Sequence, residues 1–170
     1  MEEPSYFPPN PFTDLTVFEA ASVPTVVVEA KNHPMADLPS LFDRTFTGLF
    51  PALESAAVDI VGPAFSLYTR QPSDTVDIQI GVPVSAGLTR SLDLGGDLRA
   101  VPAELPGGSV AATSHIGSFD GLAGAWEAFT DEIHAAGLHP GLPFFEVYVS
   151  EPGPDVDPAT LRTDLFVCLS

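Results

Sequence analysis

The sequence repeats one pattern of apolar and aromatic residues after 80 positions. In each half, large apolar residues fall three or four positions apart, which is the spacing of one face of a helix. These residues are Phe42, Phe46, Leu49 and Leu53 in the first half, and Leu122, Trp126, Phe129 and Ile133 in the second. A short motif repeats at the same offset: Pro63, Phe65 and Tyr68 are followed by Pro143, Phe145 and Tyr148. The chain is therefore expected to fold as two similar units.

Runs rich in β-branched and aromatic residues flank both helical patterns and predict strands. The expected strands are 23–31, 64–70 and 75–84 around a helix at 38–53, and 109–114, 144–150 and 162–169 around a helix that starts near Phe119. The repeated order predicts an α+β fold. In this fold, two pseudo-symmetric βαββ modules form a curved antiparallel sheet, with two main helices on one side and a central ligand cleft.

Three further predictions concern the ends of the helices and the alignment of the two halves. Pro51 should end or kink the first helix early, because proline lacks the amide hydrogen that a helix interior uses. Asp77 aligns with Asp164 at an offset of 87, which an insertion in the second half would explain. Gly137 is suited to the left-handed backbone that follows the end of a helix.

The length of 170 residues is enough for one well-packed domain and too little for two ordinary ones. Prolines at positions 4, 8, 9 and 11 predict that residues 4–12 lie extended against the body of the domain, within a proline-rich N-terminal extension at residues 1–15.

Acidic residues dominate the charge of the chain and are spread evenly over both halves. There are 23 Asp and Glu against six Lys and Arg, which gives a net charge of −17. Nucleic acids and anionic membranes are bound through Lys and Arg, so neither is an expected partner.

No apolar run approaches the roughly 20 residues of a membrane span, and the acidic N-terminus lacks the positive region of a signal peptide. A cytoplasmic location is therefore expected.

Glu146 is the most informative single residue. It lies in the middle of an apolar run, and strand alternation places it on one face with Phe144 and Tyr148. A carboxylate there is either exposed beside surface aromatics or buried, and a buried one needs a partner. Burial would raise its pKa, whereas a cationic ligand would lower it. The second alternative is suited to a counter-ion for a cation or to a general base.

Six aromatic residues are candidates for the wall of a ligand site around this carboxylate, because aromatic faces attract lipophilic cations. They are Phe65, Tyr68, Phe119, Trp126, Phe144 and Tyr148. Aromatic residues at helical spacing are also typical of a core, and we assign Phe46 and Phe129 to it. Tyr68 and Tyr148 are the better site candidates, since they hold symmetric positions and carry hydroxyls that need partners.

No metal site and no cofactor are expected. His134 and His139 are not at the spacing of metal ligands, and the one cysteine, Cys168, lies in an apolar run typical of a buried strand. The glycine pairs at 95–96 and 107–108 are expected in turns, because a phosphate-binding loop would need a helix directly after it.

Five short motifs occur in a fixed order along the chain. They are GPAFSLY at 62–68, GVPV at 81–84, LPGG at 105–108, HIGSF at 115–119 and FEVY at 145–148. Together they resemble the GyrI-like small-molecule-binding domain, a fold also found as the effector-binding half of multidrug-responsive transcription activators. The resemblance implies a single GyrI-like domain at 16–170, with repeat halves at about 16–85 and 100–170.

The resemblance also implies roles for individual residues. The signature acid of the family falls on Glu146, where it meets the positive charge of amphipathic ligands, and Trp126 falls at a cleft-facing aromatic position. Phe119 stands where the family usually has Tyr, so a hydroxyl contact is missing. The DNA-binding segments of the regulators are absent, so we do not expect the chain to act as a DNA-binding regulator by itself.

Three functions stay open. The first is a stand-alone binding protein for apolar or cationic amphipathic compounds. It would act by sequestration, or by hydrolysis of a strained cyclopropane-containing toxin for self-protection, with Glu146 as general base and Tyr68 or Tyr148 bonded to the activated carbonyl. The second is a non-catalytic sensor, and the third is an acidic protein-interaction module of the gyrase-inhibitor type. A lipophilic or cationic small molecule is the expected ligand, and a homodimer is compatible with all three.

Overall fold

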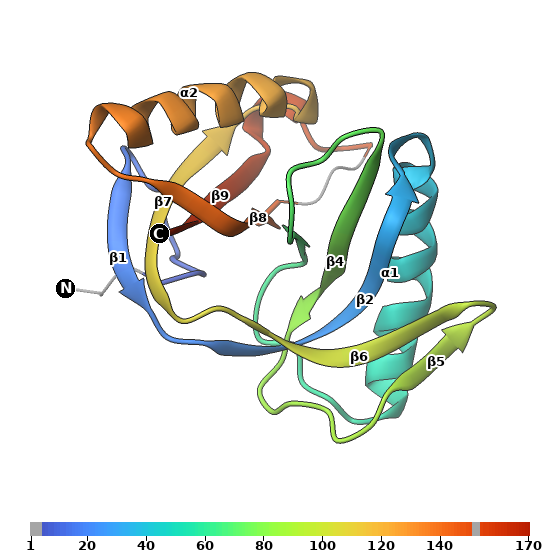
Figure 1. Ribbon diagram of the computed structural model, residues 1–170. Coiled ribbons are helices and arrows are strands. Elements are labelled where there is room, and N and C mark those ends of the chain that lie inside the picture. Colours follow the sequence, from blue (N-terminus) through green and yellow to red (C-terminus); the bar gives the residue numbers. More distant parts are fainter. Residues whose placement is uncertain (1–4, 151–153) are drawn as a thin grey trace. The chain divides into compact units, whose positions relative to one another are not determined.

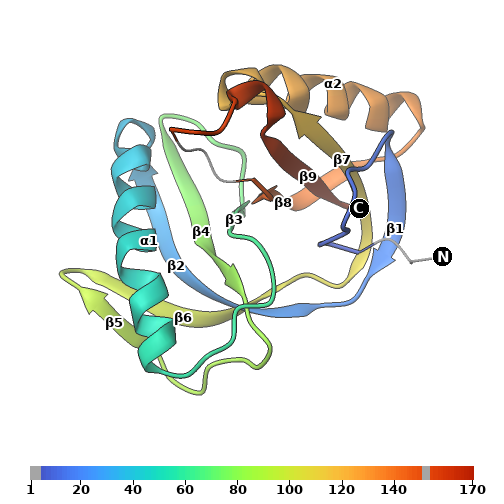
Figure 2. The ribbon, with the colours of Figure 1, turned by 180° about the vertical axis from the view of Figure 1, so that it is seen from behind.

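The computed structural model describes residues 5–150 and 154–170 (Figures 1 and 2). Within these residues, nine strands and two main helices confirm the α+β class. The chain divides into two compact units. Unit 1 combines the N-terminal residues up to Ala21 with Gly107–Ser170, and unit 2 is Ser22–Pro106. Neither main helix of the described residues is long and apolar enough to cross a membrane.

In unit 1, four antiparallel strands lie in the order β1-β7-β9-β8. The strands are β1 (Thr16–Ala20), β7 (Gly108–Ile116), β8 (Pro140–Tyr148) and β9 (Arg162–Leu169). A 3-10 turn, η2 (Phe119–Gly121), leads into helix α2 (Leu122–Ala135), and another, η3 (Pro158–Thr160), precedes β9. Figure 1 shows α2 along one face of these strands. Phe129 and Ile133 of α2 are buried there against Ala111, Leu165 and Val167.

In unit 2, five antiparallel strands lie in the order β3-β4-β2-β6-β5. The strands are β2 (Val23–Pro34), β3 (Phe65–Tyr68), β4 (Thr75–Pro83), β5 (Leu92–Gly95) and β6 (Leu98–Leu105). The 3-10 turn η1 (Met35–Asp37) and helix α1 (Leu38–Ser55) follow β2. Leu49 and Leu53 of α1 are buried against Val26, Val82 and Ala100.

The two units share one arrangement, which confirms the two predicted βαββ modules. The sequence β7-α2-β8-β9 in unit 1 matches β2-α1-β3-β4 in unit 2. The strand order β1-β7-β9-β8 likewise matches β6-β2-β4-β3, so β1 and β6 occupy equivalent positions. The repeat boundaries of 16–85 and 100–170, and the division into residues 1–15 and 16–170, stay predictions.

Two predicted details of the helix ends had different outcomes. Pro51 does not end α1, because the helix continues to Ser55, so this alternative is wrong and the kink stays a prediction. Pro51 and Thr47 are both exposed, so the carbonyl that lacks a helical partner can bond to water, while the burial of Leu53 holds the last turn. Gly137 follows α2 with a φ of 77°, which confirms its predicted place after the helix.

The strand register corrects one alignment within the repeat. In the two units, equivalent ladder pairs are Phe65↔Gly81 and Phe145↔Phe166. The offset between β4 and β9 is therefore 166 − 81 = 85 residues. The predicted match of Asp77 with Asp164 at 87 is wrong, and the equivalent of Asp77 is Arg162.

Candidate functional site

Strand β8 presents different residues on its two faces, as alternation predicts. Phe144 and Glu146 lie opposite Val167 and Leu165 of β9, and these residues of β9 belong to the core under α2. Phe145 points to the other face, where it stacks on Phe166 at a centroid distance of 5.0 Å. The expected grouping of Phe144 with Glu146 on one face is confirmed, and this face is the one that α2 covers.

Glu146 is buried, with 8% of its surface exposed. The alternative of an exposed glutamate beside surface aromatics is therefore wrong. The indole N–H of Trp126 donates a hydrogen bond to the carboxylate, whereas Oε2 is buried and has no hydrogen-bond partner. Burial raises the pKa of Glu146 to about 7, and the bond from Trp126 opposes this shift. The carboxylate is thus poised to change its charge near neutral pH.

Two aromatic pairs lie at either end of this part of β8. The ring of Trp126 meets Phe144 edge to face at a centroid distance of 5.2 Å. The ring of Phe119, from η2, meets Tyr148 in the same manner at 6.0 Å. Glu146 lies between Phe144 and Tyr148 along the strand. The structure therefore brings together five of the predicted site residues within unit 1.

Thr163 is a polar residue of this face that the sequence analysis missed. It lies opposite Tyr148 in the ladder, and alternation along β9 places it on the same face as Leu165. Its Oγ1 is buried and, like Oε2 of Glu146, has no hydrogen-bond partner. A buried polar atom without a hydrogen-bond partner costs about 1–3 kcal/mol of stability. Two such atoms on one face indicate a site where a ligand or a water molecule supplies the missing hydrogen bonds. The signal in the sequence is a threonine at an apolar position of the alternation.

Phe65 and Tyr68 belong to unit 2, where both are buried on β3. Their membership in one site with the residues of unit 1 stays a prediction. Phe129 is part of the core of unit 1, and Phe46 packs against the core of unit 2. The assignment to the core is confirmed for Phe129, whereas Phe46 is partly buried at the edge of the core.

Two other residues with reactive side chains, His115 and Cys168, lie in surroundings typical of structural roles. A ring nitrogen of His115 donates to the carbonyl of Ser118 at 2.9 Å and so fixes the backbone that starts η2. Cys168 is partly buried, and burial raises the pKa of its thiol. Among residues 5–150 and 154–170, no three His, Cys, Asp or Glu side chains group as a metal ion would need.

A family model for the GyrI-like small molecule binding domain matches residues 18–169, nearly the whole chain. The chain belongs to this family. Solved structures agree on the fold of this GyrI-like domain. The EcmrR C-terminal domain is 13% identical with a TM-score of 0.74, over 92% of this chain and 97% of that one. In the EcmrR–DNA complex the TM-score is 0.73, and the GyrI-like domain spans 57% of that longer chain.

Two further structures show the same fold. SAV2435 bound to tetraphenylphosphonium is 13% identical with a TM-score of 0.67, over 93% of this chain and 94% of that one. A hydrolase from Listeria innocua is 12% identical with a TM-score of 0.62, over 94% and 93% of the two chains. No curated protein sequence matches this chain significantly. The family model confirms the predicted family, and the solved structures confirm the fold.

Replacing Trp126 with phenylalanine should raise the pKa of Glu146 further. The substitution keeps an aromatic ring beside Phe144 but removes the N–H that stabilises the ionised carboxylate. Carbon-13 NMR titration of the Glu146 carboxyl group in wild type and Trp126→Phe measures the change. An unchanged or lower pKa would show that the indole is not the donor that matters.

Proposed function

We propose that this GyrI-like domain binds lipophilic cationic small molecules and that Glu146 supplies their counter-charge. The observation that carries the proposal is the buried Oε2 of Glu146, which has no partner. A cation beside this atom would supply the missing interaction and offset the cost of burying the charge. The faces of nearby aromatic rings add attraction for the same cation.

The proposed ligand-binding residues extend beyond the carboxylate. In unit 1 they are Phe119, Trp126, Phe144, Glu146 and Tyr148, and in unit 2 they are Phe65 and Tyr68. Two comparisons support a small molecule as the ligand: the family is a small molecule binding domain, and SAV2435, which has the same fold, was solved with tetraphenylphosphonium. An apolar wall with few polar groups is typical of sites for such compounds.

The affinity for a lipophilic cation should rise with pH through neutrality. Only the ionised form of Glu146 attracts the cation, and its pKa of about 7 leaves little of that form at pH 5.5. The ionised fraction grows about 30-fold from pH 5.5 to pH 8.5, and the association constant should follow it. Binding at pH 6 should also release a proton, which calorimetry in buffers of different ionisation enthalpy detects.

The test is isothermal titration of tetraphenylphosphonium and of neutral triphenylmethanol into wild type and Glu146→Gln. The substitution should weaken cation binding roughly tenfold or more at pH 8 and abolish the pH dependence, while neutral-ligand affinity changes little. Glu132→Gln is the matched control, because it removes one exposed carboxylate from α2. Equal cation affinity and an equal pH profile in wild type and Glu146→Gln would overturn the proposal.

Hydrolysis is a second candidate, and the pKa of Glu146 favours it. A general base works best when its pKa is near the working pH, and about 7 meets this condition. In this version Glu146 takes a proton from a water that attacks a strained, cyclopropane-containing electrophile, and Tyr148 donates to the activated carbonyl. Incubation followed by mass spectrometry separates the candidates. A hydrolase yields a product heavier by one water that Glu146→Gln fails to form, whereas a binder returns the compound unchanged.

A further inference from the structure

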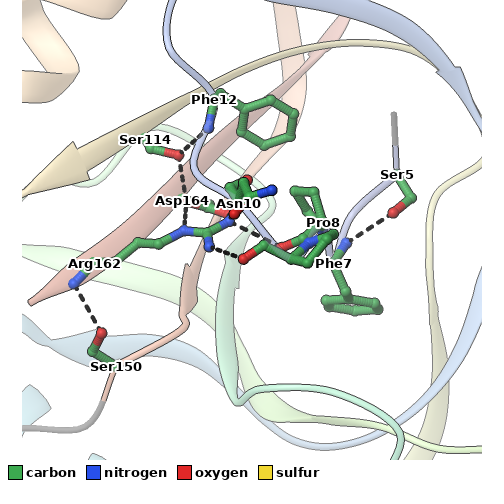
Figure 3. Close-up of polar contacts among 10 residues, drawn as sticks. Ser5, Phe7, Pro8, Asn10, Phe12, Ser114, Ser150, Arg162 and Asp164 are labelled. Carbon is green, nitrogen blue, oxygen red and sulfur yellow. Dashed lines mark hydrogen bonds and ion pairs between the residues drawn. The ribbon is translucent and has the colours of Figure 1, made fainter. Parts of the chain in front are cut away.

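The segment of residues 5–12 lies on unit 1 as a peptide ligand lies on a receptor (Figures 2 and 3). It covers the face of the sheet opposite α2, where Phe145 and Phe166 point. The ring of Tyr6 meets each of these two rings edge to face at a centroid distance of 5.2 Å. Tyr6 is 2% exposed, so residues 5–12 lie against the body of the domain as expected, while Pro4 falls outside the described residues.

Arg162 holds the middle of the segment through main-chain carbonyls. Its Nη1 donates to the carbonyl of Pro9 at 3.2 Å. Its Nη2 donates to the carbonyls of Pro8 and Asn10 at 3.1 and 3.2 Å (Figure 3). These bonds involve no side chain of the segment, so the guanidinium recognises the path of the backbone.

A buried carboxylate fixes the guanidinium in this position. Nε and Nη2 of Arg162 donate to the two oxygens of Asp164 at 3.0 and 2.7 Å. Arg162 and Asp164 are 7% and 0% exposed. The hydroxyl of Ser114 donates to Asp164 at 2.6 Å and accepts the amide of Phe12 at 2.9 Å, so one network holds both the arginine and the end of the segment (Figure 3).

Two aromatic anchors flank the recognised carbonyls. Tyr6 is the first, and Phe12, six positions later, is the second. The ring of Phe12 meets Phe166 edge to face at 5.8 Å and stacks with Phe18 at 6.3 Å. Residues 6–12 are thus held at three places: at the ring of Tyr6, at the carbonyls that Arg162 binds, and at the ring of Phe12.

The prolines between the anchors suit the donor groups of Arg162. Pro8, Pro9 and Pro11 have no amide hydrogen, so the segment places few unpaired donors against the sheet. A guanidinium has five donors and no acceptor, which matches a stretch that offers carbonyls. Surfaces that bind proline-rich peptides likewise combine aromatic rings with polar groups. Binding is favourable because an extended proline-rich chain loses little conformational entropy.

We propose that this face of unit 1, formed by Phe18, Ser114, Phe145, Arg162, Asp164 and Phe166, is a docking face for extended proline-rich segments. Residues 5–12 are its resident occupant. A segment of a partner protein with the pattern aromatic-x-Pro-Pro-x-Pro-aromatic replaces them, because the contacts depend on carbonyls and two rings. The covalent connection gives the resident segment a high effective concentration, so the intact protein resists replacement until the resident segment is loosened.

The experiment uses a fluorescent peptide with the sequence of residues 5–14 and measures anisotropy with full-length proteins. The acceptor is Tyr6→Ala combined with Phe12→Ala, which removes both resident anchors. It should bind the peptide at least roughly tenfold more tightly than wild type does. Phe50→Ala is the matched control, because it removes an exposed aromatic ring from α1 of unit 2 and should behave as wild type. A peptide with alanine at both anchor positions should not bind.

Two results would overturn the proposal. One is a folded acceptor, judged by circular dichroism, that binds the peptide no better than wild type. The other is equal binding of the peptides with and without anchors. If the double variant does not fold, Phe12→Ala alone serves as the acceptor, because Tyr6 then still covers Phe145 and Phe166. A smaller gain in affinity is expected there, and no gain over wild type overturns the proposal.

Discussion

Replacing Glu146 with glutamine should stabilise the ligand-free protein by about 3 kcal/mol at pH 8 and leave its stability unchanged at pH 4. The carboxyl group has a pKa of about 7 when folded and 4.5 when exposed, because burial disfavours its ionised form. Below pH 4.5 it is protonated in both states, so ionisation makes no difference to the free energy of unfolding. As the pH rises from 4.5 to 7, the unfolded state gives up its proton first and gains stability relative to the folded state. Glutamine has nearly the same shape and never ionises, so it escapes this cost.

Urea unfolding followed by circular dichroism at pH 4.5, 6 and 8 measures the effect as the difference between wild type and Glu146→Gln. The difference should grow between pH 4.5 and 7 and level off above. Glu132→Gln controls for the loss of one negative charge from a chain of net charge −17, because Glu132 is exposed on α2. A variant that is less stable than wild type at pH 8 would contradict the assignment of Glu146 as a costly buried carboxylate.

The second large effect concerns Gly81, near the end of β4. A Cβ atom at this position would overlap the carbonyl oxygen of Val26 and lie 2.8 Å from the Cα of Val27. Both atoms belong to the backbone of β2, so no side-chain rotation relieves the overlap. Gly81→Ala must separate β2 from β4 in the centre of unit 2, and we expect a loss of roughly 3 kcal/mol or more.

Gly124→Ala is the matched control for this substitution. Gly124 is exposed within α2, and a Cβ there meets no atom within 4 Å. Alanine is the better helix former, so this variant should be more stable by about 0.5–1 kcal/mol. Thermal unfolding by circular dichroism measures both variants. If Gly81→Ala unfolds at the wild-type temperature, the close approach of β2 and β4 is not what requires glycine there.

The helices could be predicted from the sequence because each buries one regular face. The three- and four-residue spacing correctly indicated the buried face of each helix. The buried residues include Leu49 and Leu53 in α1, and Phe129 and Ile133 in α2. Strands β5 and β6 were missed, since their runs are short and interrupted by Asp93, Arg99 and Pro102. The same holds for β1, which has an exposed Val17 and Glu19 among its five residues.

For the site, the sequence identified the residue but not its surroundings. Alternation along β8 assigned Glu146 to a face, but burial depends on α2, which comes from a different part of the chain. The bond from Trp126 and the unpaired Thr163 depend on the same packing. The role of Arg162 was also hidden, because the carbonyls that it binds lie more than 150 residues earlier in the chain.

The contact between Trp126 and Glu146 has a practical consequence. Trp126 is the only tryptophan of the chain, so all indole emission comes from one ring whose N–H is bonded to the candidate carboxylate. Indole emission responds to nearby charge and to hydrogen bonding. The protein therefore carries an intrinsic optical reporter at its candidate site. Libraries of unlabelled compounds can be screened against it in solution by the colour and intensity of that single emission band.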